Sequence, residues 1–127
     1  MDRHIFSFEK LEVWQKARTL VTLVYQLVKK FPSEEKFSLT SQIQRAVVSV
    51  ASNIAEGTSR SSMKEQCRFT EVAYGSLMEL YCQLMLSKDL SYISEEELKS
   101  EKTLIEEISN KLNALKNSQL KRIELNK

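Results

Sequence analysis

The apolar positions of the chain recur with a helical period along most of its length. The clearest stretch runs from residue 42 to residue 56, where apolar side chains occupy well over half of the helical circumference at about 100° per residue. The polar residues of this stretch share one narrow stripe. A helix that is apolar around most of its girth lies at the centre of a fold. We therefore expect the rest of the chain to pack around residues 42–56.

The same period predicts four helices joined by short connections. Short connections favour antiparallel neighbours, so we expect an all-α fold, an antiparallel up-down-up-down four-helix bundle. The 127 residues include only two glycines and one proline, which suits a single domain of long helices spanning residues 1–127. The predicted helices cover about residues 9–31, 38–57, 62–90 and 94–117.

Local signals predict where these helices begin and end. Pro32 ends the first, and Gly57 is suited to the left-handed position after the second. The third and fourth begin with capping boxes, Ser-Met-Lys-Glu at residues 62–65 and Ser-Glu-Glu-Glu at residues 94–97. After Asn117 the apolar pattern decays, so both termini are expected to be frayed.

The second and third helices carry more apolar surface than the neighbours in one bundle can cover. Exposed patches of this kind mark protein interfaces, so we expect a homo-oligomer. The alternative is a monomer in which long side chains and loops cover the excess. The candidate oligomer or partner surface consists of Trp14, Tyr74, Met78, Tyr81 and Met85.

Polar stripes run along the second and third helices. If these helices form a hairpin, Arg45 lies within a turn of Glu79, and we expect the two to form an ion pair. Two interpretations stay open: a ligand groove or oligomer channel, and a structural seam or simple solvent face. The residues of this candidate polar seam are Gln42, Arg45, Ser49, Asn53, Glu56, Arg68, Ser76 and Glu79.

The formal net charge is +2, from 19 basic and 17 acidic residues, which is too small to indicate a polyanionic partner by itself. Basic residues nevertheless concentrate on the first helix and at the C-terminal end. An oligomer would multiply each basic patch, so contact with RNA or DNA is a hypothesis beside that of an ordinary solvated surface. The candidate nucleic-acid contacts are Lys10, Lys16, Arg18, Lys29, Lys30, Lys121 and Arg122.

The sequence offers no catalytic or metal-binding pattern. The only histidine is His4, and the two cysteines, Cys67 and Cys82, stand 15 residues apart on one predicted helix, about 22 Å and beyond disulfide reach. We therefore expect no catalytic residues, no metal and no cofactor, and a protein that is not an enzyme. Without a signal peptide or a long apolar run, no membrane association and a reducing, cytoplasmic location are expected.

Several segments resemble one family along nearly the whole chain, from about residue 8 to residue 115. They include Phe-Glu-Lys-Leu-Glu-Val-Trp-Gln-Lys-Ala at residues 8–17, Phe-Pro at 31–32, Gln-Ile-Gln-Arg-Ala at 42–46, Ser-Val-Ala-Ser-Asn-Ile-Ala-Glu-Gly at 49–57 and Gly-Ser-Leu-Met-Glu at 75–79. These segments resemble the four-helix bundle proteins encoded in 23S rRNA intervening sequences, also called the S23 ribosomal protein family. The sequence departs from the pattern at Ala51, where proline is common, and at Tyr81, where an acid is common.

The resemblance implies a bundle that assembles as a ring, typically a homopentamer. It extends distantly to the accessory protein of diversity-generating retroelements, a basic pentamer that partners a reverse transcriptase and nucleic acid. Neither family has assigned catalytic residues, and membership of the ribosome does not follow from the name. The expected function is a non-enzymatic homo-oligomeric scaffold that contacts RNA or DNA through basic patches. The alternative is a protein–protein interaction module without a nucleic-acid role.

Overall fold

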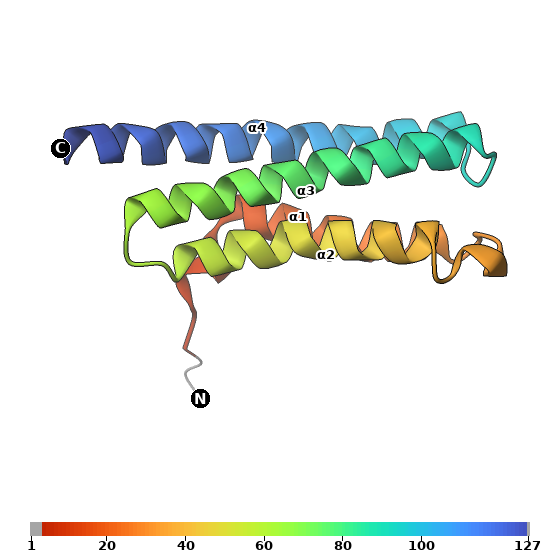
Figure 1. The fold of residues 1–127 in the computed structure, drawn as a ribbon, viewed down its shortest axis with the longest axis horizontal. Coiled ribbons are helices and arrows are strands. Elements are labelled where there is room, and N and C mark those ends of the chain that lie inside the picture. The colour runs from red at the N-terminus through yellow and green to blue at the C-terminus, as the bar shows by residue number, and fades with distance from the viewer. Residues whose placement is uncertain (1–3, 127) are drawn as a thin grey trace.

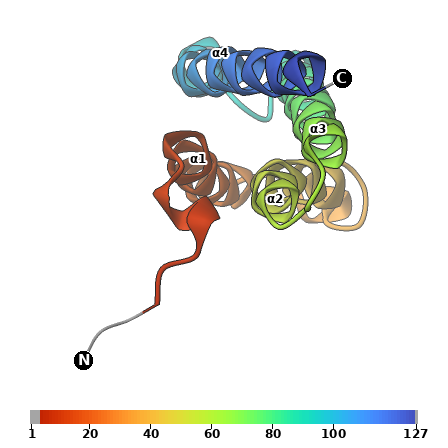
Figure 2. The ribbon, with the colours of Figure 1, turned by 90° about the vertical axis from the view of Figure 1, so that its left-hand side faces the viewer.

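The computed structural model describes residues 4–126, which form an antiparallel bundle of four α-helices, as predicted (Figure 1). Helices adjacent in the sequence pack against each other, and α1 packs against α4 to close the bundle. Viewed end-on, the four helices stand at four corners (Figure 2). The elements are η1 Ser7–Lys10, α1 Glu12–Val28, η2 Ser33–Glu35, α2 Leu39–Thr58, α3 Met63–Asp89 and α4 Glu95–Leu125, where η denotes a short 3-10 helix.

The core consists of aliphatic side chains from all four α-helices, together with Phe31 and Ile93 from the connecting segments. α2 contributes its Ile43, Val47, Val50 and Ile54 face, but Val48 on its other side is exposed. The helix therefore occupies a corner of the bundle, and the expectation that residues 42–56 form a central helix is wrong (Figure 2). A four-helix bundle has no central helix, because each member meets two neighbours and solvent.

The two predicted capping boxes form to different extents. At the start of α4 both bonds are present, since Glu97 N donates to Ser94 Oγ at 3.1 Å and Ser94 N donates to Glu97 Oε1 at 2.8 Å. At the start of α3, Glu65 N donates to Ser62 Oγ at 3.1 Å, while the Glu65 carboxylate pairs with Arg68. The Ser62 box is thus half formed, because a nearby cation takes the glutamate that would complete it.

The predicted bounds of α1 and the predicted role of Gly57 at the end of α2 are wrong. α1 spans Glu12–Val28, shorter than the predicted 9–31, because η1 precedes it and Phe31 turns inward against the Tyr92 ring, with 5.3 Å between centroids. Gly57 lies inside α2, and no glycine among residues 4–126 has a positive φ. Gly57 serves close packing instead, since a Cβ added there would lie 3.0 Å from Phe69 Cβ.

The C-terminal end of α4 is helical to Leu125, so the predicted fraying after Asn117 is wrong for the described residues. Thr70 Oγ1 of α3 donates to Gln119 Oε1 at 2.8 Å, and both residues are buried. Leu120 and Ile123 also line a groove with the first turns of α3. The last turns of α4 are held by packing, which the weak apolar pattern of this segment does not reveal. Residues 1–3 and 127 lie outside the described residues.

Candidate functional site

Three members of the predicted polar seam meet between α2 and α3. The Ser49 and Ser76 hydroxyls are hydrogen-bonded at 2.8 Å, and Asn53 Nδ2 donates to Ser49 O at 2.8 Å and to Ser49 Oγ at 2.9 Å. All three residues are half-buried. The arrangement satisfies its own donors and acceptors, so this part of the stripe is a structural seam that fixes the register of the two helices.

The expected ion pair between Arg45 and Glu79 does not form. Glu79 accepts a hydrogen bond from Gln83 Nε2 at 3.3 Å, while Arg45 borders a shallow hollow with Tyr25 and Val48. Neither charge has an ion-pair partner among residues 4–126. Both side chains are exposed, because each lies on the outer side of its helix, beyond the seam that Ser49 and Ser76 form.

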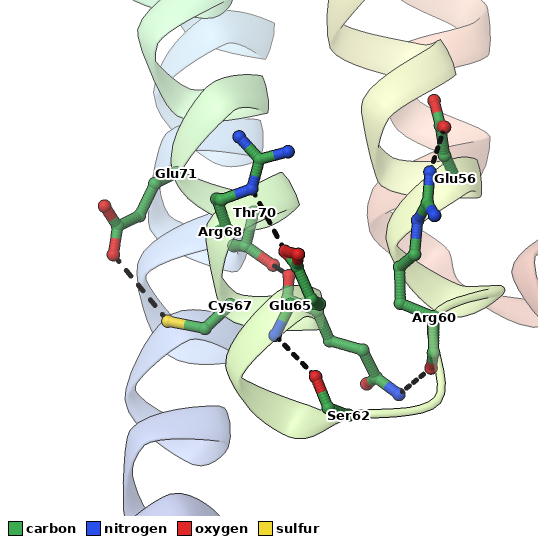
Figure 3. Close-up of polar contacts among 9 residues, drawn as sticks. Glu56, Arg60, Ser62, Glu65, Cys67, Arg68, Thr70 and Glu71 are labelled. Atoms are coloured by element: carbon green, nitrogen blue, oxygen red, sulfur yellow. Dashed lines mark hydrogen bonds and ion pairs between the residues drawn. The ribbon is translucent and has the colours of Figure 1, made fainter.

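The remaining residues of the predicted seam lie away from the Ser49–Ser76 contact. Glu56 pairs with Arg60, and Arg68 Nε pairs with Glu65 at 3.0 Å, both at the turn between α2 and α3 (Figure 3). Gln42 lines a hollow at the opposite end of α2. Residues 4–126 therefore do not bring the predicted seam residues together in one groove, and a channel between copies stays a prediction.

The α2–α3 turn carries two guanidinium groups, one of which the sequence reasoning missed. Arg60 and Arg68 lie over the ring of Phe69, with their Cζ atoms 4.7 Å and 5.1 Å from its centroid. Each also has a carboxylate partner, Glu56 and Glu65 respectively. The two positive charges are thus neutralised locally and contribute little free charge to this end of the molecule.

Neither cysteine has the surroundings of a nucleophile. Cys67 is buried, and its Sγ lies 3.7 Å from Glu71 Oε1 (Figure 3). Burial and then the Glu71 carboxylate raise the pKa of the Cys67 thiol, which keeps it protonated at neutral pH. Cys67 borders the groove of about 710 Å³ between the start of α3 and the end of α4. Cys82 is exposed and free.

Glu101 is a buried carboxylate that the sequence reasoning missed. It follows Leu98 and precedes Ile105 at core spacing on α4, and this spacing is the signal that could have revealed it. Its Oε2 atom has no hydrogen-bond partner among residues 4–126. Burial, and secondly the charge of Glu97, raises the pKa of Glu101. A single buried carboxylate without partner acids, bases or ligands makes no catalytic site.

The predicted partner surface divides between the core and the solvent. Trp14, Tyr74 and Tyr81 are half-buried and pack against the core, whereas Met78 and Met85 are exposed. The exposed residues belong to a longer stripe on the outer side of α3, which we call the α3 outer stripe: Val72, Gly75, Glu79, Cys82 and Leu86, flanked by Met78 and Met85.

Gly75 contrasts with Gly57, because no atom lies within 4 Å of the position that its Cβ would take. A glycine within a helix costs about 1 kcal/mol relative to alanine. Nothing within residues 4–126 requires this glycine.

The predicted nucleic-acid contacts fall into three groups. Lys16 of α1 pairs with Glu107 of α4 at 3.3 Å, and Lys30, just after α1, pairs with Glu97 of α4. Arg18 lies over the Trp14 ring, 5.5 Å from its centroid. The remaining residues are exposed and have no ion pair within residues 4–126: Lys10, Lys29, Lys121 and Arg122.

Three of these free cations lie toward one end of the bundle. Lys10 precedes α1, and Lys121 and Arg122 lie on the last turns of α4, which extend beyond the α2–α3 turn (Figure 1). Lys64, on the first turn of α3, is exposed near the same end. Lys29 lies toward the opposite end. The predicted patches on the first helix and at the C-terminus thus converge only in part.

The described residues define an all-α protein of the four-helix bundle class. Residues 4–126 contain no group of three or more His, Cys, Asp or Glu side chains able to hold a metal ion. Every helix in the same range is too short or too polar to cross a bilayer.

Residues 9–114 match the family described as 23S rRNA-intervening sequence protein, and the chain belongs to that family, as its resemblance indicated. A solved structure from Bacteroides thetaiotaomicron, described as a protein of unknown function from the S23 ribosomal protein family, is similar in fold. It is 25% identical, the match covers 82% of this chain and 97% of that one, and the TM-score is 0.76. No functionally curated protein matches this chain.

Proposed function

We propose that the protein is a non-enzymatic, cytoplasmic homo-oligomeric scaffold that binds RNA or DNA through basic side chains at one end of its bundle. The observation that carries the proposal is the set of exposed cations without acidic partners at that end. Lys121 and Arg122 lie on the projecting end of α4, with Lys10 and Lys64 on neighbouring elements. Phosphates bind such side chains with release of counterions, so the affinity depends strongly on salt.

Oligomerisation supplies the charge that one copy lacks. A single chain has a formal charge of only +2. If copies associate around an axis along the bundle, their projecting α4 ends lie on the same side, and the cations of all copies face one ligand. The ring, typically of five copies, that the family resemblance implies would have this property. The family description refers to 23S rRNA, which favours a structured RNA as the first ligand to test.

Light scattering at micromolar concentration tests the oligomer. We expect a mass that is a multiple of 14.7 kDa. A particle of 14.7 kDa under these conditions would overturn the proposal.

A gel-shift titration with a structured RNA hairpin of about 30 nucleotides, at about 50 mM and 200 mM salt, tests nucleic-acid binding. We expect binding at low salt that weakens by a factor of ten or more at high salt. The double variant Lys121→Gln/Arg122→Gln should bind at least tenfold more weakly. The matched control Lys29→Gln/Lys99→Gln removes two exposed lysines from the other end and should bind like the natural protein. An oligomer that binds neither RNA nor duplex DNA at 50 mM salt would favour the protein-interaction alternative.

A further inference from the structure

The α3 outer stripe has the spacing of a helix–helix contact, but no helix within residues 4–126 packs on it. Its residues follow one another by three and four positions, as the contact positions of packed helices do. Val72 is 41% exposed and Leu86 is 48% exposed, and the methionines beside them are exposed as well. Apolar side chains that stay exposed along the outer side of a helix need a partner to be removed from water.

Gly75, in the middle of this stripe, indicates that the partner approaches closely. Glycine is a poor helix former, and a helix interior keeps it at a cost unless another element passes close to the backbone. At Gly57 that element is Phe69 of the same chain, whereas the space over Gly75 is empty. The close neighbour of Gly75 must therefore come from outside the chain.

Two unpaired charges at the same height along the bundle axis identify a second copy of the chain as this neighbour. Glu79 lies in the stripe and Arg45 on the outer side of α2, each without an ion-pair partner among residues 4–126. The hydrogen bond between Ser49 and Ser76 fixes the register of α2 and α3, and Arg45 and Glu79 each lie one turn from it in the same direction. The two charges are therefore at one level along the bundle.

Rotation about an axis parallel to the bundle preserves this level. It brings Arg45 of one copy to the height of Glu79 of the next. α2 and α3 occupy neighbouring corners, and their outer sides face different directions (Figure 2), as a cyclic contact between unlike surfaces requires. The α2 surface also offers apolar partners, since Val48 borders the hollow of about 390 Å³ beside Arg45.

A second apolar contact falls at a matching level. Phe37, two residues before α2, is 89% exposed. The residues that follow it, Ser38 and Leu39, line one groove with Leu86 and the end of α3. The same rotation therefore brings Phe37 of one copy to the level of Leu86 of the next.

We propose that the α3 outer stripe of one copy docks on the outer side of α2 of a second copy, with Glu79 paired to Arg45 across the contact and Gly75 at its closest approach. This inference rests on the proposed function, because it names the surfaces through which the oligomer forms. It also gives a reason for two unpaired charges and one costly glycine that the isolated chain leaves unexplained.

Charge reversal in separate chains tests the contact. Glu79→Arg and Arg45→Glu each place like charges across it, and we expect a rise of at least tenfold in the dissociation constant for each variant, measured by sedimentation. In a one-to-one mixture, every contact between unlike variants joins an acidic and a basic side chain. The mixture should therefore form oligomers heavier than either variant forms alone, which an ion pair within one chain would not achieve. Glu106→Arg, an equal charge change on the outer side of α4, is the control and should leave the mass unchanged.

Each outcome bears on the proposal. Circular dichroism verifies that every variant is folded. If the natural protein is oligomeric and both single variants keep its mass, or if the mixture is no heavier than the separate variants, the docking surface is wrong and the proposed scaffold stands. If the natural protein is a single subunit, the proposed function itself is wrong. Gly75→Leu gives a second measurement: it should dissociate the oligomer without lowering the subunit's stability, and an unchanged mass would count against the proposal.

Discussion

The two glycines of this protein occupy opposite kinds of surroundings in the same pair of helices. Gly57 lies where α2 and α3 meet near their shared turn, and Phe69 fills the space that a side chain would need. Gly75 lies on the outer side of α3 with nothing over it. The first glycine is explained by the packing of the chain, and the second is not. The difference separates the part of the molecule that the chain completes from the part that it leaves for a partner.

The largest expected effect is the substitution of leucine at Gly57. The new side chain would force α2 and α3 apart at Phe69, and overpacking of this kind costs about 1–3 kcal/mol. The free energy of unfolding in urea measures the loss. Gly75→Leu is the matched control and should keep or raise the stability of the subunit, since leucine is the better helix former. Equal losses at both glycines would break the comparison.

Glu101, like Gly75 and Glu79, is costly to the isolated subunit, but it lies in the core and not on the outer side of a helix. Glu101→Leu removes a buried carboxylate with an unpartnered oxygen, and we expect a gain of about 1–2 kcal/mol at pH 7. The mass of the oligomer should not change, because the penalty is internal to the subunit. A changed mass with unchanged stability would show that Glu101 acts at an interface.

The free energy of unfolding should depend on pH because of Glu101. The pKa of Glu101 is raised in the folded protein, so the folded state binds the proton more tightly than the unfolded chain. Stability contributed by this group is therefore present below the unfolded pKa and lost as the pH rises through the folded pKa. Urea unfolding from pH 4 upward should show this loss in the natural protein and a smaller one in Glu101→Gln.

The buried hydrogen bond between Thr70 and Gln119 should stabilise the packing of α4 on α3 near the α2–α3 turn. Gln119→Ala leaves the Thr70 hydroxyl without this acceptor, and we expect a loss of about 1 kcal/mol. Amide hydrogen exchange should accelerate selectively in residues 117–125. Glu124→Ala, on the exposed side of the same segment, is a suitable control. Uniform acceleration across all four helices would contradict a local role.

The smallest effect is expected at an exposed ion pair. Glu65→Gln weakens the contact with Arg68 at the α2–α3 turn, and such pairs contribute about 0–0.5 kcal/mol. The melting temperature should therefore change little. A loss comparable to that at Gln119 would mean that the turn is a buried contact in the assembled protein.

Much of the fold could be predicted from the sequence because helices are specified locally. The four helices, their order and the full capping box of α4 depend on residues a few positions apart. The prediction failed where contacts between residues far apart in the sequence decide helix ends and burial. The Thr70–Gln119 bond holds a segment whose own apolar pattern is weak, and Gly57 packs on Phe69 instead of ending its helix. Burial of Glu101 likewise depends on which side of α4 faces the core.

The sequence alone determined that this chain is an all-α bundle of its family, since period, caps and motifs are properties of short segments. The tertiary structure decided which polar residues meet. It joined Ser49 to Ser76, left Arg45 and Glu79 apart, and placed Gly75 under open space. A helical period states which residues share a side of a helix, but the register and rotation of packed helices decide what that side faces.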